Sequence, residues 1–166
     1  MALHNPALLP LIPERLLRKH HVHERYDTRF RAAARLLQAL WRERQNLPEG
    51  HYTNAAGRRR RLGSRLATDA AKNGANFLSP EIFGQARCDL AYREPGALMD
   101  IERMQANLLS SMPLCFNLFA PLKQDKALAR RVFARLAPGV AKQITHIQFE
   151  HSPGRGDPTF TGDGSA

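Results

Sequence analysis

The chain has 166 residues, 43% of them hydrophobic, and a formal net charge of +10. That length suits one folded domain with a buried core, and no apolar run reaches the roughly 18 residues that a membrane helix needs. The two cysteines, Cys88 and Cys115, have neither the number of a disulfide framework nor the spacing of a zinc site. We therefore expect reduced thiols, no membrane association and a cytoplasmic location.

The positive charge is concentrated in the first part of the chain. Residues 1–66 hold 14 Lys and Arg against 5 Asp and Glu, whereas residues 67–166 hold 11 against 10. Such a basic segment attracts polyanions because their counterions are released on binding, and nucleic acid is the commonest such partner. A solvated surface that only keeps the protein soluble is the alternative explanation. On this basis the chain divides into a basic helical region, 1–66, with an Arg-rich linker, and a remainder, 67–166.

The first clear helix is predicted over residues 28–45, with Asp27 as its N-cap. Its apolar residues recur at three- and four-residue spacing, so we expect them to face the core: Phe30, Ala33, Ala34, Leu37, Leu40 and Trp41. Residues 51–65 follow, in which Gly57 and Gly63 enclose four arginines. Glycines around a charged run predict a loop or linker.

A second helix start is predicted at Ser79-Pro80-Glu81. Serine is a good N-cap, proline suits the first helical position, and an acid is favourable at the positive end of the helix dipole. Two more helices are expected over residues 100–111 and 125–136. The apolar segment 113–122 between them is expected in the core.

Residues 142–150 are the one predicted strand, because Thr145, Ile147 and Phe149 alternate with more polar residues. An isolated strand would leave its backbone donors and acceptors unpaired on both edges. The expected fold class is therefore α/β. A mainly helical N-terminal portion leads into the first strand of an incomplete sheet whose other strands are not in this chain.

Four short stretches of the second half resemble restriction-endonuclease-like proteins of the PD-(D/E)XK nuclease superfamily. They are REPGAL from Arg93, NLLSS from Asn107, PLCFNLF from Pro113 and FEHSPGR from Phe149. The resemblance implies a mixed sheet flanked by helices, on which an Asp and a Glu-x-Lys hold divalent ions such as Mg²⁺. It also implies hydrolysis of phosphodiesters by a water molecule that the metal activates.

The sequence departs from that pattern, because none of its 15 acidic residues is followed by a lysine two positions on. The last residues, 162–166, resemble the loop that precedes the metal-binding strand in the family. On this interpretation the chain is a truncated, N-terminal portion of a nuclease-like protein. A complete family member would use Mg²⁺, whereas this chain is expected to bind none and to be inactive alone.

Glu102 is the candidate catalytic residue, because it lies on the segment that resembles the family's first core helix, where an acid can join the metal shell. A solvated helix acid is the alternative. The candidates for nucleic-acid binding are Arg58, Arg59, Arg60, Arg61 and Arg155. Arginines of this kind grip phosphates, although a solvated linker is the alternative.

No metal site is predicted. His20, His21 and His23 have no partner ligands elsewhere in the sequence and are interpreted as a surface cluster. The acids Asp157 and Asp163 are explained by turn chemistry, since Asp-Pro and Asp-Gly pairs favour turns. Two other functions stay open: a small basic helical protein that binds nucleic acid or another partner without catalysis, and a nonfunctional fragment.

Overall fold

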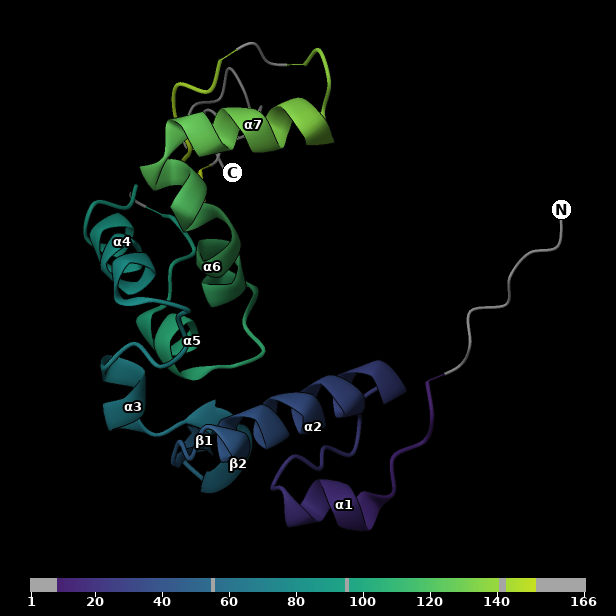
Figure 1. The fold of residues 1–166 in the computed structure, drawn as a ribbon. Helices are drawn as coiled ribbons and strands as arrows, with labels where there is room; N and C mark the ends of the chain where they lie inside the picture. Colours follow the sequence, from purple (N-terminus) through teal and green to yellow (C-terminus); the bar gives the residue numbers. More distant parts are fainter. Residues whose placement is uncertain (1–8, 55, 95, 141–142, 152–166) are drawn as a thin grey trace, which may run out of the picture. The chain divides into compact units, whose positions relative to one another are not determined.

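The computed structural model describes residues 9–54, 56–94, 96–140 and 143–151, and Figure 1 shows its helices and strands. The chain forms two compact units. The first comprises Met1–Asn76 with Gln105–Ser110, and the second comprises Phe77–Met104 with Ser111–Ala166. Helices combine with a two-stranded sheet in the described residues, so the fold is α/β, as predicted. None of the described helices is long and apolar enough to span a membrane.

The first unit is built on a β-hairpin packed against a long helix. The hairpin strands pair antiparallel, and helix α2 contacts β2 (Figure 1). Its elements are α1 (Glu14–Lys19), α2 (Arg29–Arg44), β1 (Glu49–Thr53), β2 (Arg59–Leu66) and α3 (Thr68–Lys72).

Helix α2 confirms the prediction of a helix in this region, with a different cap. The Thr28 side chain accepts a hydrogen bond from the Arg31 backbone N–H at 3.2 Å. Asp27 instead accepts a hydrogen bond from Arg35 Nε at 2.5 Å. Thr28 therefore caps the helix by satisfying a backbone donor of its first turn, whereas Asp27 forms an ion pair with a side chain further along the helix.

The predicted inner face of α2 was right for Trp41, which packs against a core cluster, and wrong for the centre of the buried face. The buried residues of the helix are Leu36, Ala39 and Arg42, whereas Phe30 and Leu37 are 69% and 65% exposed. The buried face therefore includes a charged residue, which an apolar pattern counts as facing solvent. Because Arg42 lies inside, the true face is rotated away from the apolar residues that defined the predicted one.

The loop predicted over residues 51–65 was also wrong, because this segment forms most of the β1–β2 hairpin. Consecutive arginines conceal the strand pattern, since only Leu62 among the residues around them is an apolar core residue. Gly63 is not a turn residue either. A Cβ at this position would lie 2.0 Å from the His20 carbonyl oxygen, so the close approach of the two backbones requires glycine.

The second unit is a set of packed helices. α4 lies beside α6, and α7 follows α6 (Figure 1). Its helices are α4 (Pro80–Ala91), the first four residues of α5 (Ile101–Ala106), α6 (Ser111–Gln124) and α7 (Lys126–Leu136). The core residues are Ile82, Ala86, Met99, Met104, Met112, Phe116 and Ala120.

The predicted start of α4 is confirmed, since Ser79 Oγ accepts a hydrogen bond from the Ile82 N–H at 3.3 Å. The helix predicted over 100–111 is interrupted. α5 ends at Ala106, and the Leu108 N–H donates to the Ser64 carbonyl oxygen at 3.2 Å, outside any helix. This contact with β2 competes with helix continuation, which residue spacing alone does not reveal. The prediction that the apolar segment 113–122 lies in the core is only partly right, because Phe116, Ala120 and Leu122 are buried whereas Leu114 and Leu118 are each 57% exposed.

The strand predicted over 142–150 was wrong for the part that the structure describes, 143–150, which contains no strand. Glu150 has a φ of +53°, outside the extended region. Phe149 is buried in another way, because its ring packs against Phe116 with the ring centroids 4.3 Å apart. Lys126 donates to the Thr145 carbonyl oxygen. Ile147 and Phe149 are thus half-buried in a segment that pairs with no strand among the described residues.

Candidate nucleic-acid interface

The β1–β2 hairpin presents the Arg-rich run to solvent. All four residues of Arg58–Arg61 are exposed. In the strand register Thr53 is opposite Arg59, Tyr52 opposite Arg60, and His51 opposite Arg61. Because side chains alternate along a strand, Arg59 and Arg61 lie on one face of the hairpin and Arg60 on the other.

The turn that joins the two strands is held by Asn54. Its side-chain oxygen accepts hydrogen bonds from the backbone N–H of Ala56 at 3.1 Å and of Arg58 at 2.8 Å. The Asn54 N–H donates to the Arg58 carbonyl oxygen at 3.1 Å. Gly57 has a φ of +75°, a conformation that glycine adopts without steric cost. The first arginine of the run therefore stands on an ordered turn rather than on a linker.

The arginines differ in their partners. Arg60 forms an ion pair with Glu24, and Arg61 forms one with Glu49. Arg59 Nη2 donates to His51 Nδ1 at 3.2 Å, a neutral partner because that nitrogen accepts. Neither Arg58 nor Arg59 pairs with a carboxylate among the described residues. These two guanidinium groups thus keep their full charge toward an external anion.

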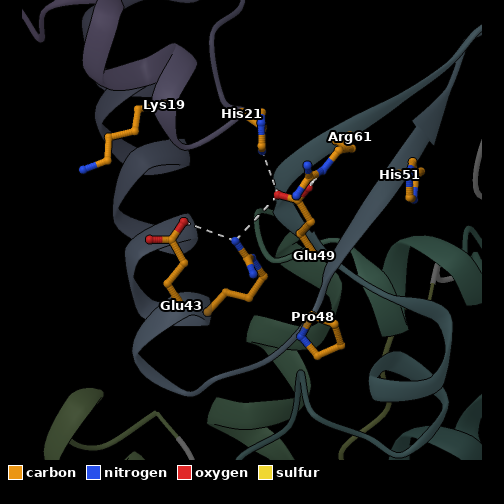
Figure 2. A pocket seen from close by; sticks show the side chains of 8 residues that line it. Lys19, His21, Glu43, Pro48, Glu49, His51 and Arg61 are labelled. Atoms are coloured by element: carbon orange, nitrogen blue, oxygen red, sulfur yellow. Dashed lines mark hydrogen bonds and ion pairs between the residues drawn. The ribbon is translucent and has the colours of Figure 1, made fainter.

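The base of the hairpin is fixed by the Glu49 carboxylate, which borders a hollow of about 520 Å³. Glu49 accepts hydrogen bonds from His21 Nδ1 at 2.9 Å and from Arg61 Nε. Figure 2 shows its carboxylate between these two side chains, with Lys19 pointing away from it. The side chain of Glu49 is only 12% exposed. Because Glu49 belongs to β1, its contacts with His21 and Arg61 link this strand to the segment after α1 and to β2.

Arg42 lies beneath this cluster and is 6% exposed. Its Nε donates to the Gly63 carbonyl oxygen at 2.9 Å and its Nη1 to the Leu47 carbonyl oxygen at 2.7 Å. Burial lowers the pKa of the Arg42 guanidinium, the nearby Arg61 lowers it further, and Glu43 opposes both effects. Arginine nevertheless stays protonated, so Arg42 is a buried cation that clamps α2 to β2.

The three neighbouring histidines each face a glutamate. His20 Nδ1 lies 2.9 Å from a Glu43 oxygen, His21 Nδ1 2.9 Å from Glu49, and His23 Nε2 3.6 Å from Glu14. A carboxylate only accepts, so Nδ1 of His20 and of His21 carries the proton. Sequence reasoning missed the first two pairs, since their partners are more than 20 residues away and no spacing rule connects them.

The remaining predicted site residues lie elsewhere. Glu102 is an exposed residue in the first turn of α5, and it belongs to the second unit. Arg155 lies outside the described residues, as do Asp157 and Asp163. His151 Nδ1 lies 2.7 Å from Glu94 Oε1 in the second unit. The structure thus gathers the four hairpin arginines in the first unit.

The described residues do not provide a site for the Mg²⁺ ion that the resemblance implies. Within the described ranges, no group of three or more His, Cys, Asp or Glu side chains could hold a metal ion. Mg²⁺ prefers carboxylate oxygens in a near-octahedral arrangement. Five acids of the first unit pair with arginine or histidine instead: Glu14, Glu24, Asp27, Glu43 and Glu49.

Comparison with known proteins places this arrangement in a family. A family model described as the PD-(D/E)XK nuclease superfamily matches residues 25–166, which include α2, the basic hairpin and all four motif stretches. No curated protein and no solved structure matches the chain. Since the matched stretch covers well over half of the sequence, the chain belongs to the PD-(D/E)XK nuclease superfamily.

Proposed function

We propose that this chain supplies a nucleic-acid-binding surface of a nuclease-like protein, with Arg58 and Arg59 in contact with backbone phosphates. One observation carries the proposal. Arg58, whose backbone N–H is held by Asn54, and Arg59, the first residue of β2, are both exposed, and neither pairs with a carboxylate among the described residues. A guanidinium presents a rigid fork of N–H donors that matches phosphate oxygens.

The ion pairs of the hairpin arginines determine which of the four are most available to bind phosphate. To bind phosphate, Arg60 would have to release Glu24, and Arg61 would have to release Glu49. Each exchange leaves a carboxylate without its partner, which offsets part of the gain. Arg58 and Arg59 carry no such cost and are the principal contacts. Arg155 is retained as a further phosphate contact on the evidence of the sequence.

On the catalytic side, we propose that this chain does not hydrolyse phosphodiesters alone. The sequence holds no Glu-x-Lys, and the residues that the structure describes do not fit Mg²⁺. Glu102 remains the one candidate acid, and a single carboxylate does not hold a catalytic magnesium ion. A cytoplasmic location is part of the same proposal.

The nucleic-acid surface is tested by the double substitution Arg58→Ala, Arg59→Ala. Each phosphate contact contributes about 0.9 to the slope of log K against log salt on duplex DNA. We therefore expect the slope to fall by about 1.8 and the affinity at low salt to fall by about tenfold. Retention of the purified chain on a DNA column, eluted with a salt gradient, measures both.

The matched control is Arg15→Ala, Arg44→Ala. These arginines are also exposed and lie in the same unit, so the net charge changes equally. We expect the control to shift retention much less than the hairpin variant. Equal losses in the two variants would show a diffuse charge effect, and an unchanged hairpin variant would show that the arginines are only solvated.

The proposed lack of catalysis has its own assay. The chain alone, incubated with DNA and either Mg²⁺ or Mn²⁺, is expected to give no cleavage above a control without metal. The physical reason is that metal-assisted hydrolysis needs a set of acidic ligands to place the ion against the phosphate. Robust metal-dependent cleavage that disappears in Glu102→Ala would overturn this part of the proposal.

A further inference from the structure

Two exposed tyrosines accompany the arginines of the first unit. Tyr52 is 40% exposed and lies on β1, and Tyr26 is 87% exposed and precedes α2. Neither ring is a core residue. An exposed aromatic ring beside a cation presents a face on which a planar ligand can stack.

Each ring has a guanidinium group near its centre. Arg60 Cζ lies 5.7 Å and Arg65 Cζ 6.0 Å from the Tyr52 ring centroid. Arg25 Cζ lies 5.6 Å from the Tyr26 ring centroid. Cations at these distances attract the ring and restrict its rotation. The Tyr52 ring is therefore partly ordered before any ligand arrives, which lowers the entropy cost of binding to it.

The two tyrosines are linked through the hairpin. Arg60 is opposite Tyr52 in the strand register, and it also pairs with Glu24. Tyr26 follows Glu24 by two residues, so the α-carbons of Glu24 and Tyr26 are at most about 7 Å apart. Arg60 thus connects Tyr52 to the segment that carries Glu24 and Tyr26, on the face of the hairpin opposite to Arg59.

We propose that this region binds single-stranded nucleic acid, with an unpaired base stacked on Tyr52 and an adjoining phosphate on Arg58, while Arg59 contacts the strand from the other face of the hairpin. The inference rests on the proposed function and names its substrate class. In a duplex the faces of the bases are covered by their neighbours, and only the base edges are accessible in the grooves. In a single strand the base faces are available, and aromatic rings within a basic surface are the usual platform for them.

The test uses fluorescence anisotropy with three labelled DNA probes of about 16 nucleotides, near the upper end of common single-strand site sizes. One probe is a single strand, the second has the same backbone with abasic sites throughout, and the third is the duplex. The wild-type chain is expected to bind the single strand about tenfold more tightly than the abasic strand, because only the former can stack. It is also expected to prefer the single strand to the duplex at equal salt.

Substitutions at Tyr52 separate stacking from charge. Tyr52→Leu is expected to remove the tenfold advantage of the single strand over the abasic strand, whereas Tyr52→Phe retains the ring and the advantage. Tyr92→Leu is the control, because Tyr92 is 89% exposed and belongs to the second unit. Should Tyr52→Leu fail to fold, the wild-type comparison of the three probes still decides the matter.

Two different failures can be told apart. If Arg58→Ala, Arg59→Ala leaves the binding of all three probes unchanged, the proposed nucleic-acid surface itself is wrong. If that variant loses affinity for every probe, but wild type binds the abasic strand or the duplex as tightly as the single strand, only the stacking inference is wrong.

Discussion

Replacing Arg42 by alanine is expected to lower the free energy of unfolding by about 2–4 kcal/mol, because two backbone carbonyl oxygens lose their donor and each unsatisfied buried group costs about 1–3 kcal/mol. The guanidinium donates to the carbonyl oxygens of Gly63 and Leu47 and to Glu43. Its loss leaves two backbone acceptors unsatisfied where water has little access, and it removes a cation from beside Glu49.

Trp41 makes the measurement specific to the first unit. It is the single tryptophan of the chain, lies on α2 next to Arg42, and packs against the cluster of Leu66, Ala71 and Leu108. Its fluorescence in a urea titration reports the unfolding of this unit, and the free energy follows from linear extrapolation.

The control for this prediction is Arg44→Ala. Arg44 is an exposed residue on the same helix, and a surface substitution of this kind changes stability by about 0.5 kcal/mol or less. A loss below about 1 kcal/mol for Arg42→Ala would contradict the clamping role, since that is the size of one ordinary net hydrogen bond.

Local chemistry made part of the fold predictable. The start of α4 was predicted from Ser79 and Pro80, because capping and helix initiation depend on adjacent residues alone. The existence of α2 and of α7 followed from spacing in the same way. The four motif stretches were sufficient for the family, which the family model confirms over residues 25–166.

The candidate site was less predictable, because its geometry comes from distant pairs. The sequence identified the arginines 58–61 but assigned them to a linker, since four like charges conceal the strand period. It could not show that Glu24 and Glu49 neutralise two of them, because these glutamates are 36 and 12 residues away from their arginines. The distinction between Arg59 and Arg60 therefore depends on the hairpin register, and register is a property of the folded chain.

The opposite error concerns the segment 143–150, which was predicted as a strand but contains none. Alternation in Ile147 and Phe149 is the pattern of a half-buried strand, but a strand also needs a partner edge for its backbone. Among the described residues the two strands pair with each other, in the first unit. Ile147 and Phe149 are half-buried without a strand, and Phe149 packs against the core of the second unit.

Truncating a residue of that core is expected to cause the second large loss of stability. Phe116→Ala is expected to lower the free energy of unfolding by about 3–5 kcal/mol, the usual cost of truncating a buried phenylalanine. Phe116 is 1% exposed and is the largest fully buried side chain of the described residues. Its removal opens a cavity between α4 and α6, and it also removes the support of the Phe149 ring. Circular dichroism at increasing urea concentration measures the loss of the helices.

The matched control is Leu118→Ala on the same helix. Leu118 is 57% exposed, so its truncation is expected to cost about 0.5 kcal/mol or less. The double variant with Phe149→Ala then isolates the ring pair. If the two rings support each other, the cycle gives a coupling energy of about 0.5–1.5 kcal/mol. Strict additivity would mean that Phe149 contributes nothing through Phe116, and that the burial of residues 143–150 depends on other contacts.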